Sequence, residues 1–112
     1  MSERSFHSRV VDDLRDVLPE SWVRSSVTLP SRRECDIVVD VGGLDVGPRL
    51  GFAIELESHP AECIAGAGQA SQYAGELGSG YAPIVAYPQA RHDPALDTEL
   101  RTLSRYVPVI EL

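Results

Sequence analysis

The chain has 112 residues, enough for one domain with its own hydrophobic core, so we expect residues 1–112 to form a single domain. Its net charge is −7, with 17 acidic and 10 basic residues, and every basic residue is an arginine. This acidity argues against strong nonspecific DNA binding, and the composition is typical of adaptation to high salt or of a GC-rich genome. No apolar run reaches the roughly 18 residues of a membrane span and the N-terminus is charged, so we expect a soluble, cytoplasmic protein with no membrane partner.

The first half of the chain predicts a helix followed by three strands. Apolar residues recur with helical spacing over residues 5–18, and Pro19 ends this helix. Residues 22–29 alternate between polar and apolar side chains, as expected for a half-buried strand. The β-branched segment 35–41 predicts a second strand, and the mainly apolar segment 51–57 predicts a third.

The second half alternates helices and strands. In chain order we expect a helix capped by Ser58 and ending at Gly78, a strand over 81–87, a helix opened by Asp93, and an edge strand over 107–110. The resulting order, α-β-β-β-α-β-α-β, predicts an α/β fold with a mixed central sheet flanked by helices.

Carboxylates gather on the second and third predicted strands. Because side chains alternate along a strand, Glu55 and Glu57 point to one face and Leu56 to the other. Two carboxylates about 7 Å apart along a strand can share a hard divalent cation or position a water. A bare carboxylate on an apolar strand is costly unless it is paired, which favours metal binding at Glu55, with Asp36 as a second ligand. The alternative for Asp36 is a cap at the start of its strand or an ion pair with Arg32 or Arg33.

These residues, in this order, resemble the PD-(D/E)XK nuclease-like superfamily, which includes restriction enzymes, Holliday-junction resolvases and RecB-type nucleases. In that family an Asp near the start of the second strand and an acidic-x-Lys motif on the third hold the metal. Here Asp36, Glu55 and Glu57 stand at those positions. Gln69-Ala-Ser-Gln-Tyr73 resembles the QxxxY motif that several subfamilies carry on the following helix. The resemblance covers most of the chain and implies a restriction-endonuclease-like core.

The resemblance also implies metal-dependent hydrolysis of DNA. Asp36, Glu55 and the main-chain carbonyl of Leu56 would hold Mg²⁺ or Mn²⁺, and Glu57 would orient the attacking water. Family enzymes usually carry Lys where this chain has Glu57, and this chain has no lysine. That lysine supplies a cation near the developing negative charge, which a carboxylate cannot replace directly. Some active restriction enzymes of the superfamily nevertheless have Glu at this position.

Five further side chains are candidates for substrate binding. Arg32, Arg33 and Arg49 could hold flanking phosphates as bidentate donors. Gln69 and Tyr73 are one helical turn apart, and they could bind a phosphate or support the carboxylates. The alternative is that Tyr73 packs on the sheet and Gln69 lies at the surface.

Other candidates have simpler explanations. His59 and Cys63 have helical i,i+4 spacing, but no second pair of Cys or His completes a zinc site. Cys35 and Cys63 fit neither a CxxC motif nor a disulfide framework and are expected to be small buried residues. Asp12 and Asp13 could add an outer carboxylate from the first helix, or belong to a solvated helix face.

Two other accounts of the whole chain remain open on the sequence alone. It could be a catalytically decayed nuclease-fold module that acts as a structural or protein-binding protein, since the lysine is missing, the charge is acidic and the chain is short. Such a module would bind a protein partner or form a homodimer, and a homodimer is also reasonable for an active nuclease of this size. It could instead be an unrelated α/β protein, which an unbroken parallel sheet would indicate.

Overall fold

The computed structural model describes residues 3–44 and 49–112, with side chains from residue 5 onward. Five strands form one mixed sheet in the order β1-β2-β3-β4-β5, which confirms the expected α/β class. In chain order the helices and strands are α1 (Glu3–Val17), β1 (Val23–Thr28), β2 (Glu34–Val41), β3 (Leu50–Leu56), α2 (Cys63–Leu77), β4 (Tyr81–Tyr87), α3 (Asp97–Leu103) and β5 (Val109–Glu111).

The sheet has an antiparallel half and a parallel half. β1, β2 and β3 form an antiparallel meander, whereas β3, β4 and β5 run parallel to one another. Parallel neighbours need a crossover connection, and α2 and α3 provide the two crossovers. The unbroken parallel sheet that would mark an unrelated α/β protein is therefore not what the chain forms.

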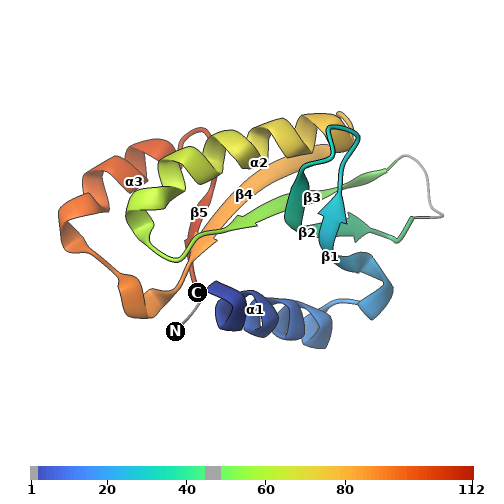
Figure 1. Ribbon diagram of the computed structural model, residues 1–112, viewed down its shortest axis with the longest axis horizontal. Coiled ribbons are helices and arrows are strands. Elements are labelled where there is room, and N and C mark those ends of the chain that lie inside the picture. Colours follow the sequence, from blue (N-terminus) through green and yellow to red (C-terminus); the bar gives the residue numbers. More distant parts are fainter. Residues whose placement is uncertain (1–2, 45–48) are drawn as a thin grey trace.

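Helices cover both faces of the sheet (Figure 1). α1 lies against one face, and α2 and α3 lie side by side against the other. The core beneath α1 is built from Phe6, Val10, Val11, Val23, Ile37, Val39, Ile54, Leu56 and Ala86. The core beneath α2 and α3 is built from alternate positions of the same strands together with Tyr73, Ala74, Cys63, Ala67 and Leu100.

The start of α2 differs from the prediction. Ser58 does not cap the helix: His59 precedes a short 3₁₀ turn at Pro60–Glu62, without a side-chain capping bond, and α2 follows from Cys63. Pro60 fits the first position of this turn because it has no N–H to leave unpaired. The tighter turn thus moves the beginning of the helix past the residue expected to cap it.

The end of α2 agrees with the prediction, whereas the expected helix after Asp93 begins as a 3₁₀ turn at Pro94–Leu96, and α3 follows from Asp97. α2 ends at Gly78, whose φ of +138° is one that residues with a side chain rarely adopt. Asp93 accepts a hydrogen bond from the backbone N–H of Ala95 at 3.0 Å at the start of the turn that leads into α3. No helix within residues 3–44 and 49–112 is both long and apolar enough to cross a membrane.

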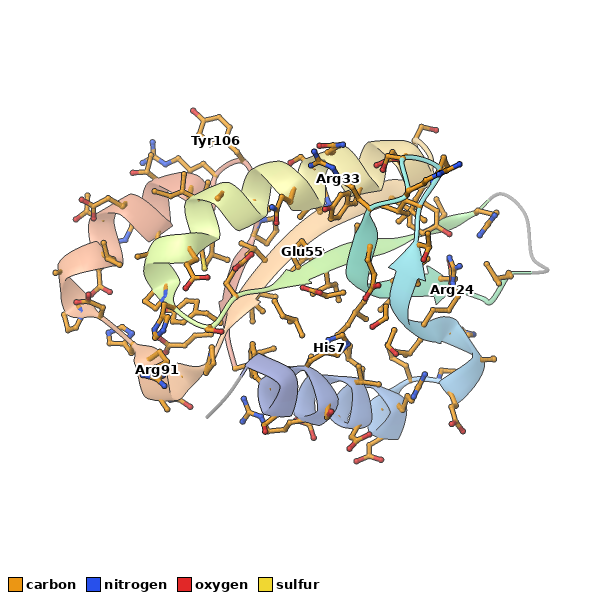
Figure 2. The ribbon with its side chains drawn as sticks, viewed as in Figure 1. His7, Arg24, Arg33, Glu55, Arg91 and Tyr106 are labelled. Atoms are coloured by element: carbon orange, nitrogen blue, oxygen red, sulfur yellow. The ribbon has the colours of Figure 1, made fainter. Side chains whose placement is uncertain are left out.

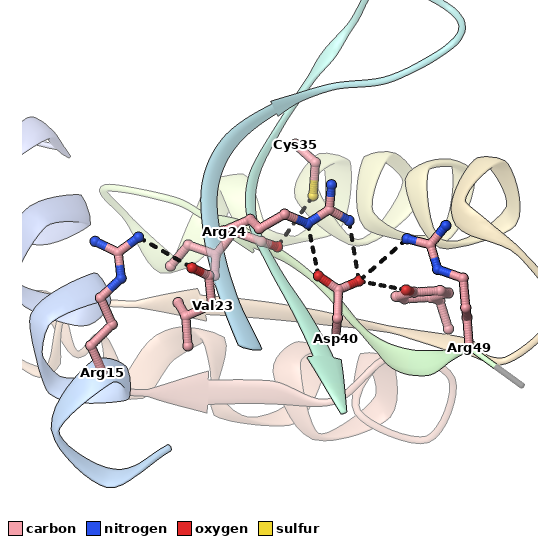
Figure 3. Close-up of polar contacts among 8 residues, drawn as sticks. Arg15, Val23, Arg24, Cys35, Asp40 and Arg49 are labelled. Carbon is pink, nitrogen blue, oxygen red and sulfur yellow. Dashed lines mark hydrogen bonds and ion pairs between the residues drawn. The ribbon is translucent and has the colours of Figure 1, made fainter. Parts of the chain in front are cut away.

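A buried carboxylate ties three strands together at one end of the sheet (Figure 3). Asp40 on β2 is 1% exposed and accepts two hydrogen bonds from Arg24 on β1, at 2.7 and 3.1 Å. It also accepts one from the Tyr81 hydroxyl on β4, and Arg49 Nη2 lies 3.8 Å away. A buried charge is tolerated when it is paired and hydrogen-bonded in this way.

Removing this carboxylate should destabilise the fold strongly. In Asp40→Ala, Arg24 and Tyr81 lose their shared acceptor, and we expect the free energy of unfolding to fall by about 3 kcal/mol. Arg49→Gln is the matched control, because this half-exposed side chain makes a long contact that contributes about 0.5 kcal/mol or less. Urea unfolding measures both. Equal losses in the two variants would contradict the role given to Asp40.

Candidate functional site

Asp36 lies where the pairing of β2 with both neighbouring strands is interrupted. On the β1 side, the pair that would join Ser26 to Asp36 is missing from an otherwise continuous register. On the β3 side, the ladder stops at Ile37 and Ile54, although both strands continue beyond it. Asp36 and Glu55 would be the next pair, so they stand opposite each other where the backbone ladder ends.

The backbone is irregular at the same point. Ser26 has a φ of +53°, in the left-handed region that residues other than glycine adopt rarely. In a regular strand Cys35 and Ile37 would share a face. Instead, Ile37 packs beneath α1 and Cys35 packs beneath α2. The change of face between these two residues takes the backbone of Asp36 out of the ladder.

The two carboxyl groups replace the missing ladder hydrogen bonds. The backbone N–H of Asp36 donates to Glu55 Oε1 at 3.2 Å, and the backbone N–H of Leu56 donates to Asp36 Oδ2 at 2.8 Å. The two carboxyl groups lie close enough for each to influence the pKa of the other. The three residues predicted to hold a metal therefore lie together. The described residues contain no group of three or more His, Cys, Asp or Glu side chains arranged to hold a metal.

Burial raises the pKa of both carboxyl groups. For Glu55, which is 6% exposed, burial and then the negative charge of Asp36 raise the pKa to about 8. Burial also raises the pKa of Asp36, whereas the hydrogen bond from Leu56 and the positive charge of His7 lower it. Two carboxyl groups this close cannot both ionise freely. The raised pKa of Glu55 therefore favours a form of the pair that keeps one proton around neutral pH.

Glu57 lies directly after β3, between the carboxyl pair and α2. Its backbone N–H donates to the carbonyl of Ala86 at 2.9 Å. A Cβ added at Gly66 on α2 would stand 2.6 Å from Glu57 Oε1, so the Glu57 side chain packs closely against the helix at this glycine. The negative charge of Glu57 contributes to the raised pKa of Glu55. The residue predicted to orient a water is thus a neighbour of the pair.

Helix α2 brings Tyr73 to the other side of the pair. Tyr73 is 5% exposed and packs with Cys35 beneath the helix. Burial and then the charge of Glu55 raise the pKa of Tyr73, while a hydrogen bond to Arg33 lowers it. Gln69, one turn earlier, is exposed. The structure thus groups Tyr73 and Arg33 with Glu55, whereas Gln69 lies at the surface.

The remaining predicted arginines lie apart from each other. Arg32 is exposed in the turn between β1 and β2, with a φ of +71°. Arg49 lies beside Asp40, in the cluster of Figure 3. Asp40 is four residues along β2 from Asp36, a distance of about 13 Å in an extended strand. Arg49 therefore belongs to a different end of the sheet from the carboxyl pair.

The other candidate residues do not join the pair. Cys35 and Cys63 are buried, free thiols, and burial raises the pKa of each to about 12. His59 is exposed, and the Cys63 thiol donates a hydrogen bond to the backbone carbonyl of His59 at 4.0 Å. Asp12 and Asp13 are exposed on α1.

Sequence reasoning missed His7. This residue is half-buried on α1 and extends toward the sheet (Figure 2). Its positive charge is one of the influences that lower the pKa of Asp36. The signal that could have found it is its spacing, three and four residues before Val10 and Val11. That spacing places His7 on the core-facing side of the helix.

The chain was compared with protein-family models, curated proteins and solved structures, and none of them matches it. The assignment of a function therefore rests on the chemistry of the Asp36–Glu55 pair and its neighbours.

The shared proton predicts how stability depends on pH. A carboxyl group whose pKa is higher in the folded than in the unfolded state stabilises the fold below the unfolded pKa, and this contribution is lost as the pH rises through the folded pKa. For Glu55 the loss falls between pH 4.5 and about 8. Glutamine has no charge to bury, so the free energy of unfolding of Glu55→Gln should fall less over this pH range than that of the unaltered chain. The difference should be on the order of 2 kcal/mol.

Urea unfolding at pH 5 and pH 8.5, in the presence of a chelator, measures this difference. Glu62→Gln is the control, since Glu62 is an exposed carboxylate in the turn before α2. It should follow the unaltered chain. If Glu55→Gln and the unaltered chain lost the same free energy of unfolding, the proton would not reside in this pair.

Proposed function

We propose that this chain is a nuclease of PD-(D/E)XK type, which hydrolyses phosphodiester bonds in DNA with Mg²⁺ or Mn²⁺. The observation that carries the proposal is the pair of carboxyl groups where the β2–β3 ladder ends, in which half-buried Asp36 stands opposite buried Glu55. Such a pair costs free energy in an apolar sheet, and catalytic carboxylates are a common reason for it.

The arrangement of the elements supports the same proposal. A restriction-endonuclease-like core has a helix before a meander of three strands, then a helix and a further strand. α1, the antiparallel strands β1–β3, α2 and β4 follow one another in this order. In that core the acidic residues lie on the second and third strands, which is where this chain carries Asp36 and Glu55.

The donor set fits a hard divalent cation. Mg²⁺ takes oxygen ligands, commonly one or two carboxylates, and keeps several waters. Asp36 and Glu55 would supply two carboxylates and the Leu56 carbonyl a third oxygen. A dication would also remove the repulsion that raises the pKa of Glu55. The chemistry that it would supply is positive charge beside the phosphate oxygens, where negative charge develops during hydrolysis.

The surrounding side chains take supporting roles in this proposal. Glu57, next to the pair and held against α2, would accept a hydrogen bond from the attacking water and orient it. Arg33, already close to Tyr73, would hold a flanking phosphate by its guanidinium group. Tyr73 is buried beneath α2, where burial and then the charge of Glu55 raise its pKa, and its ring would help to fix the position of that carboxyl group.

A second candidate function is a decayed nuclease fold that binds a protein partner or a second copy of itself. The specific observation in its favour is that Asp36 and Glu55 already satisfy backbone N–H groups across the interruption, which is a structural role needing no metal. The carboxylate of Glu57, in place of the lysine, points the same way, because it adds negative charge where hydrolysis needs a cation.

A cleavage assay separates the two candidates. The chain should cut single-stranded, linear or branched DNA in Mn²⁺ or Mg²⁺, and Asp36→Asn and Glu55→Gln should each reduce the rate by at least about 100-fold. These near-isosteric variants keep hydrogen-bonding capacity, so they preserve the fold better than alanine would. Asp13→Asn, an exposed carboxylate on α1, is the control and should leave the rate unchanged.

Glu57→Lys extends the assay, since it restores the cation that family enzymes use. Cleavage by Glu57→Lys but not by the unaltered chain would identify a decayed enzyme. No cleavage by either protein on any DNA form would contradict the nuclease proposal.

A further inference from the structure

A polar cleft lies between α1 and β1, next to the carboxyl pair but separate from it. Its volume is about 420 Å³. Its polar lining residues are His7, Ser8, Asp12, Arg15, Ser25 and Ser26. Ser26 stands opposite Asp36 at the missing pair of the β1–β2 register, so the cleft reaches the same interruption in the sheet from the α1 side.

Arg15 is the main cation of the cleft. Its Nη2 donates to the backbone carbonyl of Val23 at 3.1 Å, which anchors the guanidinium group between helix and strand (Figure 3). Its Nε is buried and has no hydrogen-bond partner within the described parts of the chain. A buried N–H without an acceptor is unfavourable, and a small rotation of the side chain toward an oxyanion in the cleft would satisfy it.

Ser26 contributes a second unusual feature. Its φ of +53° is strained for a residue with a side chain, and strained backbone of this kind gathers at functional sites. Ser26 lies across from Asp36, where the β1–β2 pairing is interrupted, and it lines the cleft beside Ser25. Two residues that carry hydroxyl groups thus line the same space as Arg15.

We propose that this cleft binds a phosphate group. A guanidinium, serine hydroxyls and an imidazole are the donors that recognise a phosphate, and the planar guanidinium matches its oxygens in a bidentate manner. Asp12 is the only carboxylate among the lining residues, and it is exposed. The phosphate could be free or part of a nucleic acid. The proposal does not depend on the nuclease function, because binding here needs neither a metal nor cleavage.

The first test is titration with inorganic phosphate in the presence of a chelator, followed through the backbone amide signals of Ser25 and Ser26. We expect saturable binding. Arg15→Gln and Ser26→Gly should each weaken it by about 10-fold, the loss of one charge-assisted or strong hydrogen bond. Asp12→Asn should tighten it by about 3-fold, since it removes a nearby negative charge.

Ser26→Gly keeps the test decisive even if Arg15→Gln is poorly folded. Glycine accepts a φ of +53° without strain, so this variant should fold at least as well as the unaltered chain while it lacks the hydroxyl. Arg101→Gln is the control, because Arg101 is an exposed arginine on α3, outside the cleft. It should bind phosphate as the unaltered chain does.

A second arm distinguishes the source of the phosphate. A short single-stranded oligonucleotide is titrated without metal, with and without inorganic phosphate as competitor. If inorganic phosphate displaces the oligonucleotide, and if the oligonucleotide binding is weakened in Arg15→Gln and Ser26→Gly, the cleft binds nucleic-acid phosphates. If inorganic phosphate binds and the oligonucleotide does not, the cleft binds a free phosphate. Either result supports the proposal. Phosphate binding that Arg15→Gln and Ser26→Gly leave unchanged, or no binding of either ligand at millimolar concentration, overturns it.

Discussion

Two hydrogen bonds from backbone N–H groups to the carboxyl groups of Asp36 and Glu55 join β2 to β3 beyond the last pair of their ladder. In these two bonds a side-chain carboxyl group accepts the hydrogen bond that a backbone carbonyl would accept in a regular ladder. The backbone conformation of the neighbouring residues depends on this replacement. The change of face between Cys35 and Ile37 and the left-handed backbone of Ser26 lie within two residues of Asp36 or directly across from it. The strands that meet at the Asp36–Glu55 pair also position its surroundings, which are Glu57, Tyr73 and the polar cleft under α1.

β2 carries three carboxylates, and the fold treats two of them, Asp36 and Asp40, in opposite ways. Asp40 accepts hydrogen bonds from Arg24 and Tyr81, so its charge is compensated within the protein and its role is structural. Asp36 instead lies opposite Glu55, and burial and the charge of Asp36 raise the pKa of Glu55 to about 8, which favours a form of the pair that keeps one proton. A proton can be exchanged for another cation as solution conditions change, whereas an anchored guanidinium cannot. This difference is the physical reason to assign chemistry to Asp36 and stability to Asp40.

The sequence allowed most of the fold to be predicted, because hydrophobic periodicity and turn residues act locally. The strand at Tyr81–Tyr87, the end of α2 at Gly78 and the cap at Asp93 are of this kind. Ser58 failed as a cap because the 3₁₀ turn displaced the helix start, which composition does not reveal. The proximity of Asp36 and Glu55 followed from their places on neighbouring strands. Strand register decides which arginine meets which carboxylate, and for this reason Arg49 could not be assigned to Asp40 beforehand.

In the proposed nuclease, a divalent cation would replace a proton held by the Asp36–Glu55 pair. Calorimetric titration of Mn²⁺ at pH 7, in buffers with different enthalpies of ionisation, measures it directly by counting the protons released. The account predicts release of about one proton per bound cation, because the ligand carboxylates must be deprotonated to bind. It also predicts that binding and release vanish in an Asp36→Ala/Glu55→Ala double variant. Binding without proton release, or equal binding by the double variant, would contradict it.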